Sequence, residues 1–336
     1  MPDIDMTVAA DDGTPLAGTL TLPAGPSPHP AVLLLHGSGP LDRDGNTPKL
    51  VMDLARPMAE ALAAAGIATL RYDRRGAGST PGDWRASGFT DNREDAAAAL
   101  RALAARPDIR SEAVGVIGHS EGALHAMALA SRTDVRAAVL LAGFAGLGED
   151  AFRRQGRSVV RTMPLPVRLL RRPLGALGNR ALTRIKKTRT DTARIAGLKV
   201  NARWMREMLV HDSRDDLAAI RTPVLAITGL KDFQVDPADL DVIEHLVPGG
   251  AETHRVADLT HVLRRDSGAP SLNSYRRILR EPVDADLLAR VTSWLTLHLD
   301  ATPQAPPRRG DVSLVLTGGR STPAEVRPSD TFDGVP

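Results

Sequence analysis

The sequence contains no cysteine, although it is 336 residues long. Disulfide bonds, zinc–thiolate sites and a cysteine nucleophile are therefore excluded. Aromatic residues are also scarce, with five Phe, three Trp and two Tyr making up 3% of the chain. Because few side chains can stack on bases and no known binding motif is present, nucleic-acid binding is the least expected function.

Long apolar runs are missing as well. No uninterrupted apolar run reaches the roughly 18 residues that a transmembrane helix needs, so no transmembrane helix is expected. The first residues, MPDIDMTVAADDGT, carry acidic side chains and lack the basic and apolar regions of a secretory signal, which predicts a cytoplasmic protein. With 42% hydrophobic and 25% charged residues, the composition is that of a globular chain. Its length suits one large α/β domain with an insertion, or two domains.

Charge is unevenly distributed. The chain holds 43 basic and 40 acidic residues, but residues 151–206 contain 16 of the basic residues and one acid, Asp191. The rest of the chain then has 27 basic and 39 acidic residues. This basic block has three interpretations. It is a face that is solvated or paired with the acidic body, a site for an anionic acyl substrate, or a surface for weak contact with an anionic membrane.

Apolar runs and helical patterns alternate along the chain. Continuous Val/Ile/Leu/Ala runs predict strands buried on both faces at 31–39, 67–73, 113–120, 136–143 and 223–229, and more weakly at 253–261. Helices are predicted at 50–66, 91–105, 121–131, 236–247 and 284–299. The alternation favours a mostly parallel central sheet with helices on both faces. An antiparallel hairpin is expected at 5–25, turning at Asp11-Asp12-Gly13.

The alternation stops between 147 and 221, where no apolar strand is predicted and 199–212 is interpreted as helical. We expect an inserted, Arg-rich helical cap over the sheet. The domain prediction is therefore a core in two parts, 1–146 and 222–300, with the cap at 147–221 and a Pro/Gly-rich tail at 301–336.

Ser120 lies in the pentapeptide Gly118-His119-Ser120-Glu121-Gly122, between a predicted strand and an Ala-rich helix. This G-x-S-x-G pattern is typical of a sharp turn that exposes a nucleophilic serine at the carboxyl edge of a sheet. The alternative is a serine that only caps the helix. A catalytic serine would need a base and an orienting acid elsewhere in the chain.

Asp232 and His261 follow the next two strands in the expected order of acid and then base. Asp258 is a rival acid, and Asp236, before Pro237, is better interpreted as a helix N-cap. The rival bases precede or lie within a strand or helix; they are His36, His119, His125 and His254.

The oxyanion of an acyl-transfer intermediate needs backbone N–H donors. One is expected from Glu121, the residue after the serine. The other is expected from the loop after the first parallel strand, with Ser38 favoured over Gly37 and Gly39. Gly37, Gly39 and Trp204 are expected to contact substrate.

The segments HGSGPLDRDG (36–45), YDRRGAGST (72–80), GHSEG (118–122), TGLKDFQV (228–235) and DLTHVL (258–263) resemble those of α/β-hydrolases. The resemblance is strongest to bacterial carboxylesterase-like members and covers about 5–300. It implies an α/β-hydrolase fold and a serine hydrolase with the triad Ser120, Asp232 and His261. It departs at Ala123, in the arginine content of the cap and in the tail.

The leading interpretation is hydrolysis of a small-molecule carboxylic ester through an acyl-enzyme, which requires no metal and no cofactor. A thioesterase or acyltransferase would use the same residues. A peptidase is less expected because nothing marks an amine-binding site, and dehalogenase chemistry would need Asp in place of Ser120. A non-catalytic binding protein on the same scaffold is the remaining alternative.

Overall fold

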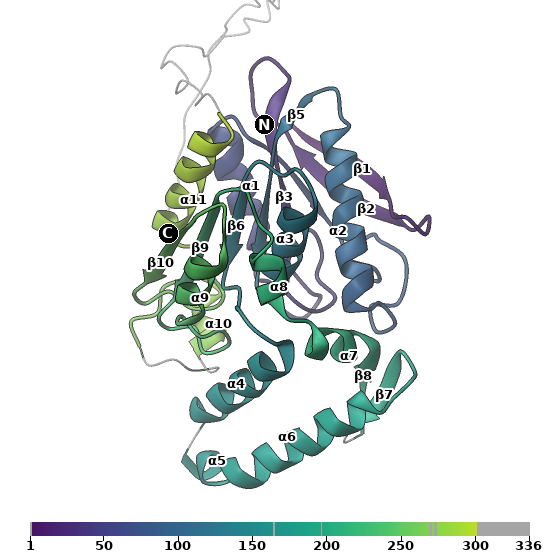
Figure 1. Ribbon diagram of the computed structural model, residues 1–336, viewed down its shortest axis with the longest axis vertical. Helices are drawn as coiled ribbons and strands as arrows, with labels where there is room; N and C mark the ends of the chain where they lie inside the picture. The colour runs from purple at the N-terminus through teal and green to yellow at the C-terminus, as the bar shows by residue number, and fades with distance from the viewer. Residues whose placement is uncertain (1, 164, 196, 269–270, 272–273, 301–336) are drawn as a thin grey trace, which may run out of the picture. The chain divides into compact units, whose positions relative to one another are not determined.

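A mixed β-sheet forms the centre of the computed structural model, which describes residues 2–163, 165–195, 197–268, 271 and 274–300. Within these residues the sheet has eight strands in the order β1-β2-β4-β3-β5-β6-β9-β10 (Figure 1). The hairpin β1–β2 and the pair β2–β4 are antiparallel, and the remaining neighbours are parallel, as predicted. The strands are β1 (Asp3–Ala9), β2 (Pro15–Thr21), β3 (His29–Leu35), β4 (Ala68–Tyr72), β5 (Ile109–His119), β6 (Ala138–Leu141), β9 (Val224–Gly229) and β10 (Ala251–Val256).

Helices cover both faces of this sheet because its strands are apolar on both faces. In β3, Leu33 packs into one apolar cluster, whereas Val32 and Leu34 pack into the other. Helices α2, α3 and α9 contribute to the first cluster, and α1 and α11 to the second. These helices are α1 (Ala55–Ala64), α2 (Phe89–Ala104), α3 (Glu121–Arg132), α9 (Asp239–Leu246) and α11 (Ala285–His298).

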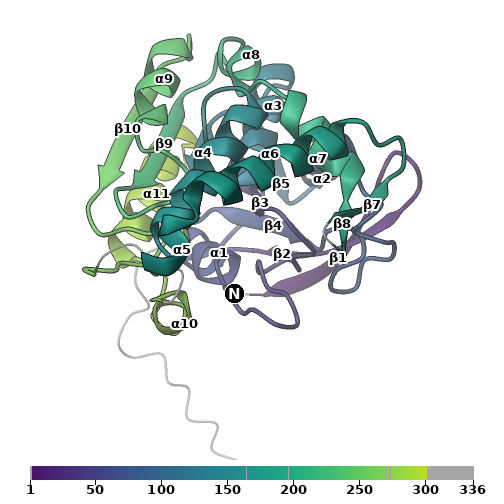
Figure 2. The ribbon, with the colours of Figure 1, turned by 90° about the horizontal axis from the view of Figure 1, so that it is seen from below.

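Residues 147–221, which we call the cap, join β6 to β9. Figure 2 shows α4 and α6 lying across the ends of the sheet strands. Phe152 on α4 and Trp204 on α7 line a cavity. Leu35 and Leu141, at the ends of β3 and β6, line the same cavity. The cap elements are α4 (Gly148–Arg161), α5 (Leu165–Leu169), α6 (Arg171–Lys186), β7 (Thr192–Ile195), β8 (Leu198–Asn201), α7 (Ala202–Val210) and α8 (Ser213–Leu217). A short α10 (Tyr275–Ile278) follows the core strands.

The cap was predicted to be helical, with 199–212 as one helical segment, but it also contains two short strands. Strands β7 and β8 form a two-stranded antiparallel sheet, and Gly197 lies in its turn with φ of 83°. Helix α7 begins only at Ala202, where the Asn201 side chain accepts a hydrogen bond from the Trp204 N–H. Both strands are four residues long and partly exposed, so no apolar run marks them. The predicted tail, 301–336, lies outside the described residues. No helix among the described residues is long and apolar enough to cross a membrane.

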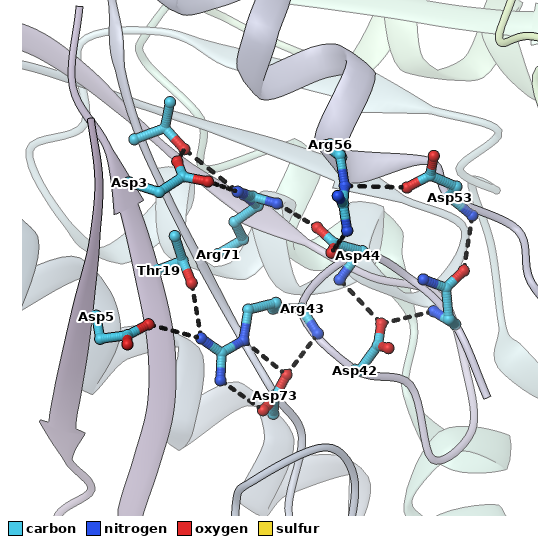
Figure 3. A network of polar contacts seen from close by, with 12 residues as sticks. Asp3, Asp5, Thr19, Asp42, Arg43, Asp44, Asp53, Arg56, Arg71 and Asp73 are labelled. Atoms are coloured by element: carbon cyan, nitrogen blue, oxygen red, sulfur yellow. Dashed lines mark hydrogen bonds and ion pairs between the residues drawn. The ribbon is translucent and has the colours of Figure 1, made fainter. Parts of the chain in front are cut away.

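A network of ion pairs fixes the loop that follows β3 (Figure 3). The Arg43 guanidinium donates to both carboxylate oxygens of Asp73, at 3.0 and 2.8 Å, and to the Thr19 hydroxyl. Asp73, at the end of β4, also accepts from the Arg43 N–H at 2.7 Å and is almost fully buried. Beside this pair, Asp44 contacts Arg56 and Arg71. The ion pair with buried Asp73 therefore holds the loop after β3 against the carboxyl end of β4.

Asp73→Asn should lower the free energy of unfolding by about 3 kcal/mol, because it removes the buried charge that accepts hydrogen bonds from the guanidinium and the backbone N–H of the partly buried Arg43. Urea unfolding followed by circular dichroism measures the change. Asp5→Asn is the matched control, since Asp5 is fully exposed and lies 3.7 Å from the same guanidinium; it should leave the free energy of unfolding close to the wild-type value, because solvent screens an exposed pair. Equal losses in both variants would contradict a dominant role for the buried pair.

Candidate active site

Ser120 lies in the sharp turn between β5, which ends at His119, and α3, which begins at Glu121. Its backbone has φ of 56° and ψ of −119°, a strained conformation for a residue with a side chain. A Cβ added to Gly118 would lie 2.1 Å from the Gly122 carbonyl oxygen, and one added to Gly122 would lie 2.2 Å from that of Leu35. Both glycines are therefore required for helix α3 to pack this closely on β5 and β3.

The Ser120 side chain does not cap the helix, so that alternative is wrong. No hydrogen bond runs from its hydroxyl to the first turn of α3. Instead, Ser120 Oγ lies 3.1 Å from His261 Nε2, within hydrogen-bond distance. The turn directs the hydroxyl towards the histidine.

His261 and Asp232 come from the loops after β10 and β9, as the chain order predicts. His261 Nδ1 lies 2.7 Å from Asp232 Oδ2, and both side chains are buried. The other carboxylate oxygen of Asp232 accepts from the backbone N–H groups of Gln234 and Val235, at 2.7 and 3.0 Å. These bonds hold Asp232 as a hydrogen-bond acceptor, which places the proton of His261 on Nδ1 and leaves Nε2 free to accept from Ser120.

The rival acids lie elsewhere. Asp258 is partly exposed and pairs with Lys231 at 3.7 Å. Asp236 accepts a hydrogen bond from the Ala238 N–H, but helix α9 starts at Asp239 with Ala238 at the N-cap. The prediction of Asp236 as the N-cap was therefore wrong, because the chain first makes a separate turn.

Three of the four rival histidines have other partners, and the fourth, His36, is buried with no hydrogen-bond partner for its Nε2 among the described residues. His254 contacts Glu252 on β10, and His125 contacts the carboxylate of Glu121. His119 Nε2 lies 2.8 Å from the His261 carbonyl oxygen. Burial lowers the pKa of His119 to about 3, so its ring is neutral and Nε2 is the donor in this bond. Nothing in the sequence pattern indicated that His119 would contact the loop of His261.

The loop after β3 lies against the serine. A Cβ added to Gly37 would be 3.4 Å from the Ser120 Cβ. Within the described residues, the Ser38 N–H donates to no other group. Glu121 is the first residue of α3, so its N–H has no acceptor within the helix. Both amides expected to hold an oxyanion are thus available beside Ser120.

The Glu121 side chain is buried in a polar cluster. Its Oε1 accepts from Arg74 at 3.0 Å and from Asn92 at 3.2 Å, and it lies 3.0 Å from His125 Nε2. Burial acts to raise the pKa of Glu121, but Arg74 and His125 outweigh it and lower the pKa well below the usual range. The carboxylate is therefore charged and paired with Arg74.

An apolar cavity of about 500 Å³ opens beside the serine. Besides Ser120 and His261, its walls include Gly37, Ser38 and Trp204. Gly39 instead lines a neighbouring cavity of about 190 Å³, which shares Ser38 and Trp204 with the first. The residues expected to contact substrate are thus divided between two adjoining cavities.

The basic block is only partly neutralised. Two arginines of the cap reach acids of the core: Arg154 pairs with Asp239 at 3.1 Å, and Arg203 with Asp91 at 2.7 Å. In the part of the chain that the structure describes, no ion pair is formed by Arg157, Arg161, Arg172, Arg180 and Arg184. Pairing with acids of the core is therefore seen for a minority of the arginines in the basic block.

The sheet order, the turn at Ser120 and the loops after β9 and β10 define an α/β-hydrolase fold. Residues 51–267 match the serine aminopeptidase family, S33, and the chain belongs to this family.

Esterases are among the similar proteins. Esterase EstD of Thermotoga maritima is 26% identical over 290 residues, which cover 83% of this chain and 65% of that protein. The chain thus spans less than two thirds of that relative's length. The structure of Est1E from Butyrivibrio proteoclasticus with ferulic acid has a TM-score of 0.59 at 17% identity, covering 88% of this chain and 99% of that one. An esterase from Pyrococcus furiosus has a TM-score of 0.57 at 18% identity, covering 89% and 91%. At these identities the two structures show a shared fold.

Buried neutral histidines should make stability depend on pH. Burial lowers the pKa of His36 to about 4 and that of His119 to about 3, so the unfolded chain binds more protons than the folded one below pH 6.5. The free energy of unfolding should therefore fall as the pH drops from 6.5 to 4, by up to about 1.4 kcal/mol per pH unit for each group.

Urea unfolding at several pH values measures how the free energy of unfolding changes with pH. His36→Gln should reduce this change, because it removes one of the two buried histidines. Ser111→Ala, at an exposed position of β5 that carries no titratable group, is the control and should keep the wild-type dependence of the unfolding free energy on pH. A His36→Gln slope equal to that of the wild type would contradict the assignment to buried His36.

Proposed function

We propose that the protein is a serine hydrolase that cleaves carboxylic esters through an acyl-enzyme on Ser120. The observation that carries this proposal is the hydrogen-bonded series Ser120–His261–Asp232, with distances of 3.1 and 2.7 Å, at the wall of an apolar cavity. Family membership and the esterases among the similar proteins support it.

In the first step, Ser120 Oγ bonds to the acyl carbon while His261 Nε2 takes the hydroxyl proton. The carbonyl electrons move to oxygen, and the backbone N–H groups of Glu121 and Ser38 hold the oxyanion. Collapse of this intermediate breaks the ester bond, and the leaving alcohol oxygen receives the proton from His261. Water then enters, gives a proton to His261 and releases the acid by the same route. Asp232 stabilises the charged imidazole in both steps.

The cavity favours an acyl ester with apolar groups as substrate. Its volume of about 500 Å³ falls in the range of small-molecule sites, and its walls include Leu54, Met58, Met208 and Phe144. The carboxylate of Glu121, the one acidic side chain among the described lining residues, is already paired with Arg74. No lining carboxylate is therefore left to hold a free amine, which favours esters over aminopeptidase substrates within this family. We propose that residues 147–221 act as a cap that shapes this cavity.

A second candidate is a thioesterase or acyltransferase acting on an anionic acyl group, which the unpaired arginines of α4 and α6 favour. Raising the salt concentration should increase KM for an acyl substrate with a carboxylate tail, while KM for the matching neutral ester stays constant. The same KM for both substrates at all salt concentrations would contradict it. Contact with an anionic membrane and a cytoplasmic location stay predictions from the sequence.

Hydrolysis of p-nitrophenyl esters, from acetate to dodecanoate, tests the proposed function. Ser120→Ala should reduce kcat by about 10⁴- to 10⁶-fold, because the nucleophile is lost. Ser111→Ala is the matched control, since Ser111 is an exposed residue on β5, the strand that ends just before Ser120, and it should keep the wild-type rate. Equal rates in the wild type and Ser120→Ala would contradict the proposal. The preferred chain length then measures the acyl part of the cavity.

A further inference from the structure

Arg74 joins the two backbone segments that carry the expected oxyanion donors. Its guanidinium is buried, with one nitrogen donating to Glu121 Oε1 at 3.0 Å and another to the His36 carbonyl oxygen at 2.9 Å. Glu121 carries one of the two expected donors on its own backbone. His36 begins the loop 36–39, which carries the other at Ser38.

From these contacts we propose that Arg74 is a positioning residue for the oxyanion hole. It does not touch the reacting atoms; it fixes the loop 36–39 relative to the first residue of α3, so that the N–H groups of Ser38 and Glu121 point to one place. This inference rests on the proposed serine-hydrolase function and adds to it a residue that sets catalytic rate.

The Glu121 side chain makes this attachment rigid. Its Oε1 is in contact with three side chains from different elements: Arg74 after β4, Asn92 on α2 and His125 on α3. A buried carboxylate held by several groups with a full counter-charge has little freedom to move. The backbone of Glu121 is therefore fixed through its own side chain.

Arg74 also donates to the His36 carbonyl oxygen, and this bond adds nothing to the charge pairing with Glu121. The loop 36–39 contains Gly37 and Gly39, and Gly39 has φ of 110°, so the backbone has much conformational freedom there. The His36 carbonyl also lies against Gly122, where an added Cβ would be 2.7 Å from it. The Arg74 guanidinium therefore holds the loop at the point where it contacts helix α3.

Arg75 provides a natural control for this inference. It is the next residue and is also held by a buried carboxylate, since it donates to both oxygens of Asp95 at 2.8 and 2.6 Å. Its other acidic partner is Asp12, in the turn after β1. Neither partner lies in the loop 36–39 or at the start of α3, so loss of Arg75 removes a comparable ion pair away from the serine.

The experiment compares Arg74→Met, Arg74→Lys and Arg75→Met with the wild type. Hydrolysis of p-nitrophenyl butyrate gives kcat and KM, inhibition by a phenylboronic acid gives affinity for a tetrahedral adduct, and thermal unfolding gives Tm. Arg74→Met should lower kcat about 10- to 100-fold with KM within about twofold, because misplaced donors stabilise the oxyanion less than fixed ones. Boronic-acid affinity should fall in parallel with kcat/KM. Arg74→Lys should be intermediate, because one ammonium cannot reproduce both contacts.

Arg75→Met should lower Tm while kcat stays within about threefold of the wild type. Equal kcat losses in Arg74→Met and Arg75→Met, or a kcat loss without weaker boronic-acid binding, would overturn the positioning role. If Arg74→Met does not fold, a wild-type kcat in Arg74→Lys overturns it instead. Absence of hydrolysis by the wild type would contradict the proposed function itself, and the role of Arg74 would fall with it.

Discussion

The close approach of helix α3 to strands β3 and β5 is the constraint on which the candidate site depends. Gly118 and Gly122 allow it, because a side chain at either position would collide with a backbone carbonyl at about 2 Å. The contact forces Ser120 into a strained backbone conformation, and the start of α3 at Glu121 leaves the Glu121 N–H without an acceptor within the helix. It also brings the loop after β3 against the serine. A single packing contact thus sets the position of the proposed nucleophile and of one expected oxyanion donor, and it brings the loop that carries the other expected donor against the serine.

Three consecutive side chains after β4 hold the surroundings of this contact. Asp73 binds Arg43 in the loop after β3, Arg74 binds Glu121 at the start of α3, and Arg75 binds Asp95 on α2. Each pair includes a carboxylate that is at most 2% exposed, so each charge needs its partner. The turn after β4 therefore holds the loop after β3, the start of α3 and helix α2, and Arg74 is the member of the three that contacts both segments carrying the expected oxyanion donors.

The parts of the structure that follow from local pattern were predictable. The runs that became β3, β5 and β9 are continuous in Val, Ile, Leu and Ala because both faces of the sheet are buried, and Asp232 and His261 follow strand ends in the chain. The hairpin β7–β8 was missed because its strands are short and polar. The bonds of Arg74 and His119 could not be predicted, since each joins residues far apart in the sequence through backbone or side-chain groups that no spacing encodes.

The most direct measurement for the account is covalent labelling by a fluorophosphonate, followed by peptide mapping with mass spectrometry. The reagent phosphonylates a serine hydroxyl only where a base and an oxyanion site activate it. We predict one adduct, on Ser120, that forms with the wild type and is lost in His261→Ala. No adduct, an adduct on another serine, or undiminished labelling of Ser120 in His261→Ala would contradict the claim that these residues form one catalytic unit.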